Sequence, residues 1–127
     1  MLSLSNTSTL QKPRVVCLCG STRFFDAFLK VNLEETLAGR IVLSVASDRQ
    51  TEEKLFVTLS QADLEHTRQN LEALHLRKID LADEILVINL GGYVGEGTAR
   101  EVRYAHQTGK PVRWLEPDSV PEEWKQP

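Results

Sequence analysis

A glycine-rich stretch in the last third of the chain combines an adaptable backbone with side chains suited to binding a sugar or a base. This stretch, the Gly91 loop, reads G-G-Y-V-G-E-G-T-A-R-E from Gly91 to Glu101, with four glycines within seven positions. Such density indicates close approach of the backbone to a ligand. Tyr93 offers a flat face for a base or sugar, or is simply an exposed aromatic. The predicted ligand-binding residues here are Gly92, Tyr93, Gly95, Glu96, Gly97 and Thr98.

Glu101 allows two interpretations. The spacing Thr98-x-x-Glu101 is that of a capping box, in which the threonine hydroxyl and the glutamate carboxylate each accept a hydrogen bond at the start of a helix. In the other interpretation the carboxylate faces a ligand and takes part in chemistry. The spacing alone favours the cap.

A second turn, the Gly20 turn, follows an apolar run and reads Gly20-Ser21-Thr22-Arg23. Free N–H groups at a helix start, together with two hydroxyls, suit an anionic or hydroxyl-rich group. Arg23 could add a forked, charge-assisted contact. The alternative is that Ser21 or Thr22 only caps the helix and that Arg23 lies in solvent.

Other titratable residues have weaker signals. Asp80 and Asp83 flank the junction of a helix and a strand, and we expect one or both of them near the carboxyl edge of the sheet or at the end of the helix. His75 and Arg77 are well placed to interact with the dipole of that helix, which is a simpler explanation than catalysis.

The two cysteines, Cys17 and Cys19, stand two apart in an apolar run. On a strand both side chains point to the same face and do not fit disulfide geometry, so we expect reduced core residues. A metal pair is the alternative, but His66, His75 and His106 show no zinc-like spacing. No cofactor and no metal are therefore expected.

Apolar patterns predict alternating strands and helices. Short apolar runs at residues 14–19, 41–45, 84–90 and 111–115 predict strands. Helical periodicity covers residues 22–37, 62–81 and 98–108, with Ser60 as N-cap of the second helix. Residues 46–60 are charged and aperiodic, which predicts a long loop with at most a short helix around residues 55–59.

This order predicts a small α/β fold, a doubly wound, flavodoxin-like or Rossmann-like parallel sheet of about four to five strands with helices on both faces. With the flavodoxin-like strand order assumed, the Gly20 turn and the Gly91 loop follow neighbouring strands at the switch point, where ligands bind. The expected organisation is a disordered leader at 1–12, one domain at 13–117 and a C-terminal tail at 118–127.

Composition and charge exclude two classes of binding partner. The chain has 127 residues and a formal net charge of −3, without a basic run that could bind a nucleic-acid backbone. No apolar stretch approaches the length of a membrane span, and the N-terminal stretch lacks a secretory pattern. We expect a cytoplasmic protein that binds a small molecule, not a nucleic-acid polymer or a membrane.

The motifs resemble those of the nucleoside 2-deoxyribosyltransferase-like superfamily, which includes nucleoside 5′-monophosphate N-glycosidases. The resemblance spans roughly residues 14–117 and rests on V-V-C-L-C-G-S-T-R-F, L-A-D-E-I-L-V-I-N and G-E-G-T-A-R-E-V-R-Y-A followed by H-Q-T-G-K-P-V. Two positions depart from the transferases. Arg100 stands just before the glutamate, where the transferases usually have a bulky residue, and Arg103 stands soon after it, where they usually have a small one.

The resemblance implies that Glu101 is the nucleophile of a retaining displacement at the anomeric carbon. It also implies that Asp83 helps to protonate the leaving base or orients the sugar, and that the Gly20 turn holds the 5′ end, with Ser21 and Arg23 on a phosphate. Because family sites are often completed by a neighbouring subunit, a homo-oligomer is implied as well.

A second resemblance is to the phosphoribohydrolases that release cytokinin bases from their riboside monophosphates, whose loop reads G-G-x-G-T-x-x-E. Here Val94-Gly95-Glu96 adds length between the two ends of that motif. Both families cleave a base from a sugar. The alternative from another class is a non-catalytic nucleotide-sensing module on the same fold. The sequence leaves open the base, the sugar, the need for a 5′-phosphate and the choice between hydrolysis and transfer.

Overall fold

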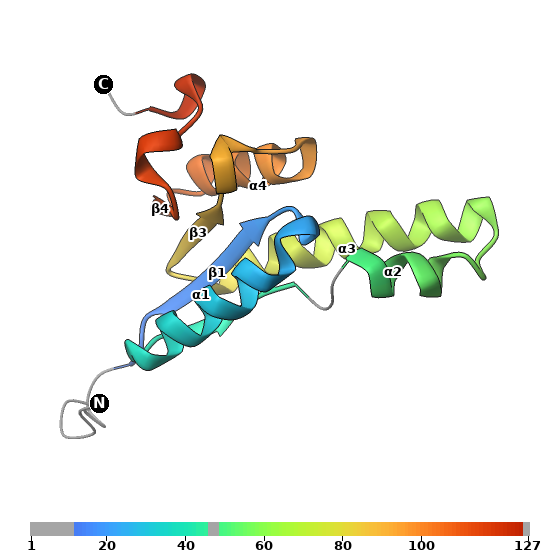
Figure 1. Ribbon diagram of the computed structural model, residues 1–127, viewed down its shortest axis with the longest axis horizontal. Helices are drawn as coiled ribbons and strands as arrows, with labels where there is room; N and C mark the ends of the chain where they lie inside the picture. Colours follow the sequence, from blue (N-terminus) through green and yellow to red (C-terminus); the bar gives the residue numbers. More distant parts are fainter. Residues whose placement is uncertain (1–11, 46–48, 126–127) are drawn as a thin grey trace.

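The computed structural model describes residues 12–45 and 49–125 as a parallel sheet with helices on both faces (Figure 1). The strands are β1 (Val15–Gly20), β2 (Ile41–Leu43), β3 (Glu84–Ile88) and β4 (Val112–Trp114). The α-helices are α1 (Phe25–Leu37), α2 (Arg49–Phe56), α3 (Gln61–Leu81) and α4 (Glu96–Gln107). The predicted fold class is confirmed, and the expected leader lies almost wholly outside the described residues.

The strand order is β2-β1-β3-β4, with every pair parallel. This is the flavodoxin-like order, with four strands. β1 and β3 lie in the centre, where Cys17 pairs with Ile85 and Gly20 with Ile88. Their apolar runs are continuous because both faces of these strands are covered.

The central strands divide their side chains between two cores by simple alternation. Val16 and Leu18 point to the face covered by α1, where they pack with Phe28. Cys17 and Cys19 point to the opposite face, which α3 and α4 cover. The candidate functional site described below lies on this second face.

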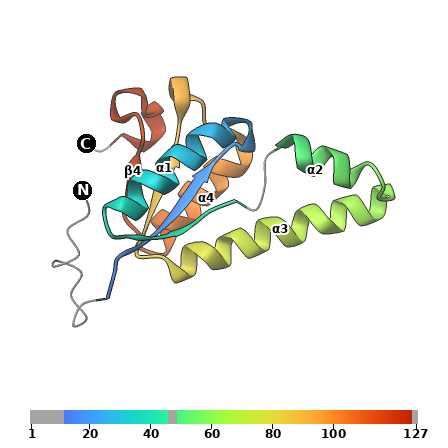
Figure 2. The same cartoon turned by 60° about the horizontal axis from the view of Figure 1, so that its bottom comes forward.

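The stretch expected to be a long loop is mostly helical, so that prediction was wrong. α2 occupies Arg49–Phe56 and runs back along α3, forming an α2–α3 hairpin that extends beyond the sheet (Figures 1 and 2). Residues 46–48 lie outside the described part of the chain. α3 begins as predicted, because the Ser60 hydroxyl accepts a hydrogen bond from the Asp63 N–H at 3.1 Å.

The tail folds back onto the end of β3 through two short 3₁₀ helices, Pro117–Ser119 and Glu122–Trp124. Asn89, fully buried, donates to the carbonyls of Glu116 and Ser119 and accepts from the Glu116 N–H. Trp124 rests against Trp114, with ring centroids 6.0 Å apart. In the described part of the chain, no helix combines the length and apolarity needed to cross a membrane.

Candidate functional site

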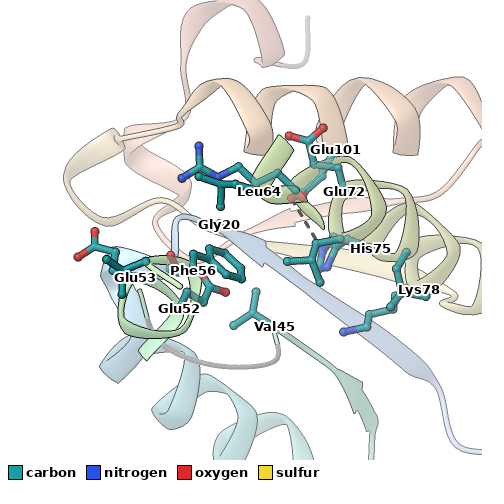
Figure 3. A pocket seen from close by; sticks show the side chains of 15 residues that line it. Gly20, Val45, Glu52, Glu53, Phe56, Leu64, Glu72, His75, Lys78 and Glu101 are labelled. Carbon is teal, nitrogen blue, oxygen red and sulfur yellow. Dashed lines mark ion pairs between the residues drawn. The ribbon is translucent and has the colours of Figure 1, made fainter. Parts of the chain in front are cut away.

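A cavity of about 600 Å³ lies between the carboxyl end of β1 and the α2–α3 hairpin. Gly20 and Thr22 contribute from the Gly20 turn, Glu101 from α4, and Phe56 and His75 from the hairpin (Figure 3). The hairpin supplies much of the apolar wall, because Leu64, Leu71 and Leu74 of α3 face the cavity. The volume is in the range of small-molecule sites.

Glu101 is a half-buried carboxylate in the wall of this cavity. Its side chain is 20% exposed, and Oε1 has no hydrogen-bond partner among the described residues. His75 lies beside that oxygen, with its Nε2 3.8 Å away (Figure 3). Burial raises the pKa of Glu101 to about 7, against the opposing effect of His75. A carboxyl group in this state can donate or accept a proton near neutral pH.

The capping box at Thr98 does not form. α4 begins at Glu96, with Gly95 as its N-cap and no side-chain cap, so Thr98 is a buried residue within the first turn. Because the helix starts three residues earlier than the motif suggests, Glu101 belongs to the second turn, where its side chain reaches the cavity. The interpretation that the spacing favoured was therefore wrong.

His75 is the site residue that sequence reasoning missed. It is buried on α3, and its Nε2 lies 3.5 Å from the Cys19 Sγ and 3.7 Å from the Cys17 Sγ. Burial alone would lower the pKa of His75, but the hydrogen bond with Cys17 and the charge of Glu101 outweigh it and raise the pKa. The available signal was spacing: His75 stands four residues before Ile79, on the inward face of α3.

Cys17 and Cys19 are free thiols in the core, as predicted. The hydrogen bond with Cys17 and complete burial both raise the pKa of the Cys19 thiol. With His75 the two thiols form the thiol–imidazole cluster (Cys17, Cys19, His75) beneath the cavity.

In the Gly20 turn, Ser21 has the helix-capping position that the sequence allowed. Ser21 caps a 3₁₀ helix, Thr22–Phe24, and accepts from the Arg23 N–H at 3.3 Å and from its Nε at 3.2 Å. The Arg23 guanidinium is exposed and lies 4.2 Å from the centroid of the Tyr93 ring. The Gly20 turn and the Gly91 loop therefore touch, as the switch-point argument expected, but Ser21 and Arg23 do not line the cavity.

The first two glycines of the Gly91 loop lie against the C-terminal tail. Gly91 and Gly92 have positive φ values of 63° and 81°, and a Cβ on Gly92 would lie 3.2 Å from the Ser119 carbonyl oxygen. The Gly91 N–H donates to Glu116 Oε1 at 3.1 Å. No residue from 91 to 98 lines the cavity, so the predicted binding set Gly92, Tyr93, Gly95, Glu96, Gly97 and Thr98 is not brought to it.

Asp83 lies at the opposite edge of the sheet. Its Oδ2 accepts a hydrogen bond from the Val15 N–H at 2.8 Å, at the amino ends of β1 and β3. Asp80 is also engaged, by the Tyr104 hydroxyl at 2.5 Å and by Arg77 at 2.7 Å. The carboxyl-edge alternative was wrong, because a residue that opens a parallel strand stands at the amino edge. The other alternative is confirmed, because Asp80 lies in the last turn of α3 and Asp83 directly follows the C-cap residue of that helix.

Of the predicted site residues, only Gly20, Thr22 and Glu101 line the cavity, where the structure adds His75 and the α2–α3 hairpin. Comparison with known proteins adds no relative: no family model, curated protein or solved structure gives a significant match to the chain.

Proposed function

We propose that the chain cleaves or transfers the N-glycosidic bond of a nucleoside or nucleoside 5′-monophosphate, with Glu101 as the nucleophile. The observation that carries this proposal is the position of the Glu101 carboxylate, which lies in the wall of a cavity at the carboxyl end of β1 with its Oε1 buried. A helix-capping glutamate would be turned away from that cavity.

In the proposed reaction a Glu101 oxygen attacks the anomeric carbon and the carbon–nitrogen bond breaks. The electron pair leaves with the base, which takes up a proton from water. Water, or a second base, then attacks the glycosyl ester and releases Glu101. Asp83 has no part in this scheme, because it lies at the other edge of the sheet.

The Gly20 turn is the proposed contact for the 5′ end of the substrate. Thr22 lines the cavity, and the exposed Arg23 stands one residue farther along the same turn. A 5′-phosphate would offer the Arg23 guanidinium a stronger partner than the Tyr93 ring on which it lies. We therefore propose that monophosphates bind more tightly than the corresponding nucleosides.

The test is product analysis after incubation with ribo- and deoxyribonucleoside monophosphates. Wild-type protein should release the free base and the sugar phosphate, whereas Glu101→Gln should lose turnover by on the order of 10³-fold or more and still bind the substrate. Addition of a free acceptor base separates the two reactions, because a transferase forms a new nucleotide where a hydrolase forms bare sugar phosphate.

Glu123→Gln is the matched control, because Glu123 is an exposed carboxylate of the tail outside the cavity. It should leave turnover unchanged. Binding without cleavage by the wild type, with equal affinity in Glu101→Gln, would support the non-catalytic nucleotide-sensing alternative. Absence of both binding and cleavage would contradict the proposal.

The proposal includes a homo-oligomer in the cytoplasm. α1 carries a row of half-exposed apolar residues on its outer side, Leu29, Leu33 and Leu37, which a second copy could cover. The negative net charge and the free cysteines are consistent with a reducing compartment and a small-molecule partner.

A further inference from the structure

The thiol–imidazole cluster has the composition and geometry of a metal site, and we propose that Cys17, Cys19 and His75 bind a soft divalent metal ion such as Zn²⁺. The ligand atoms of all three residues lie within 4.8 Å of one another, and all three residues are buried. This inference does not depend on the proposed function, since it requires no nucleoside.

The distances at His75 match those around a tetrahedral ion. With metal–sulfur and metal–nitrogen bonds of about 2.3 and 2.0–2.1 Å, a tetrahedral site separates nitrogen from sulfur by roughly 3.5 Å. The observed separations from His75 Nε2 are 3.5 Å to the Cys19 Sγ and 3.7 Å to the Cys17 Sγ. Both separations are close to that value, so His75 is placed to share an ion with the two thiols.

Rigid elements hold the three ligands. Cys17 and Cys19 alternate with Val16 and Leu18 on β1, a central strand, so their side chains share one face of the sheet. His75 comes from α3, one turn before the fully buried Ile79. Such preorganisation reduces the conformational entropy that binding would cost.

Charge also favours an ion here. Two thiols that lose their protons on binding carry a charge of −2, which a divalent ion neutralises, and His75 is a neutral ligand. The complex of ion and three ligands is then uncharged, which suits the fully buried positions of both cysteines. Thiolate and imidazole ligands select zinc-like ions over Mg²⁺ or Ca²⁺.

Glu101 supplies an independent observation. Its Oε1 is buried, has no hydrogen-bond partner in the described part of the chain, and lies 3.8 Å from His75 Nε2. A buried carboxylate oxygen without a partner is costly unless a cation or a donor faces it. A metal ion held by the cluster would supply that partner at its fourth position, directly or through a bound water. If the proposed function holds, the loaded protein would be slowed, because Glu101 would be engaged.

The test is a titration of the reduced, chelator-treated full chain with Co²⁺ and then Zn²⁺. We expect one Co²⁺ per chain, a thiolate-to-cobalt charge-transfer band in the near ultraviolet, the visible bands of a tetrahedral site, and displacement by Zn²⁺. Cys19→Ser and His75→Ala should each weaken binding by at least about 100-fold, and Glu101→Gln should shift the visible bands. His66→Ala, an exposed histidine of α3, should change nothing.

Circular dichroism establishes that each variant is folded. If Cys19→Ser does not fold, the wild-type spectrum decides the matter, because the thiolate band requires cysteine ligands. Absence of that band, or binding that Cys19→Ser and His75→Ala leave intact, would overturn the proposal.

Discussion

Glu101 and Glu84 are both largely buried glutamates, and their surroundings give them opposite properties. Glu101 faces a cavity with one unpartnered oxygen, and burial raises its pKa to about 7. Glu84 opens β3 and receives hydrogen bonds from Arg14 and Arg113. Burial alone would raise the pKa of Glu84, but the two arginines outweigh it and hold the pKa below its usual value. Glu84 is therefore structural, whereas Glu101 remains available for chemistry.

The Glu84 pairing predicts a pH-dependent contribution to stability. Because the pKa is lowered in the folded state, this contribution is present above the ordinary glutamate value of about 4.3 and is lost as the pH falls through the lower folded-state pKa. Both arginines are partly exposed, so Glu84→Gln should lower the free energy of unfolding by about 2 kcal/mol at pH 7. Urea denaturation at several pH values measures this difference.

The same denaturation series includes Glu122→Gln as its control, since Glu122 is 89% exposed and forms a surface ion pair with Lys125. That variant should change stability by less than about 1 kcal/mol. Arg113 does not lose every partner in Glu84→Gln, because Glu35 also forms an ion pair with it. A difference for Glu84→Gln that stays constant down to pH 3 would contradict the ionic origin of the effect.

At the level of elements, the apolar runs predicted β1 and β3 well, because strands covered on both faces must be apolar throughout. α2 was missed because R-Q-T-E-E-K-L-F has few apolar residues, and a short helix depends on its packing partner more than on its own sequence. The start of α4 was missed because Gly95 caps it without a side chain. The site could not be predicted fully, because Cys19, His75 and Glu101 come from three elements that only the tertiary structure brings together.

The glycines of the two turns should respond oppositely to alanine. A Cβ on Gly20 would lie 2.9 Å from the Ile88 carbonyl oxygen, at a φ of +155°, because β1 and β3 approach closely there. Gly20→Ala should therefore destabilise the fold by about 2–3 kcal/mol. A Cβ on Gly97 would meet nothing within 4 Å, and this residue lies in α4. Gly97→Ala should stabilise by about 0.5–1 kcal/mol.

Thermal and urea unfolding of both variants provide the measurement, with far-ultraviolet circular dichroism to verify the fold. Stability of Gly20→Ala equal to that of the wild type would mean that the end of β1 is less constrained than the structure indicates. A loss of stability in Gly97→Ala would place a neighbour beside a position that is open in the structure.

At the level of the whole molecule, the order of strands and helices specified the topology, while the position of the cavity depended on the hairpin. The switch-point argument placed the site between the Gly20 turn and the Gly91 loop. Instead, the tail fills the space beside Gly91 and Gly92, and the α2–α3 hairpin encloses a cavity on the other side of Gly20. The position of the cavity therefore depends on the long crossover between β2 and β3, and the two turn motifs do not predict that crossover.

The exposed row on α1 predicts self-association. Leu29, Leu33 and Leu37 are 56%, 59% and 50% exposed, and their spacing of four residues aligns them on one side of the helix. Ile41, 48% exposed, follows at the start of β2. In the described ranges 12–45 and 49–125, α1 is the only α-helix that contributes residues to the core on its face of the sheet. This face therefore has room for a second copy.

Sedimentation velocity at micromolar protein should therefore give the mass of two chains for the wild type. Leu33→Lys places a charge at the centre of the row and should raise the dimer dissociation constant by at least about 10-fold, because a buried unpaired ammonium is costly. Leu81→Lys is the matched control: Leu81 is 73% exposed at the end of α3, which covers the face of the sheet opposite to α1, and its replacement should leave the dimer intact. A wild-type chain that sediments as a monomer at all concentrations would contradict the homo-oligomer, and a dimer unaffected by Leu33→Lys would place the interface on a face other than α1.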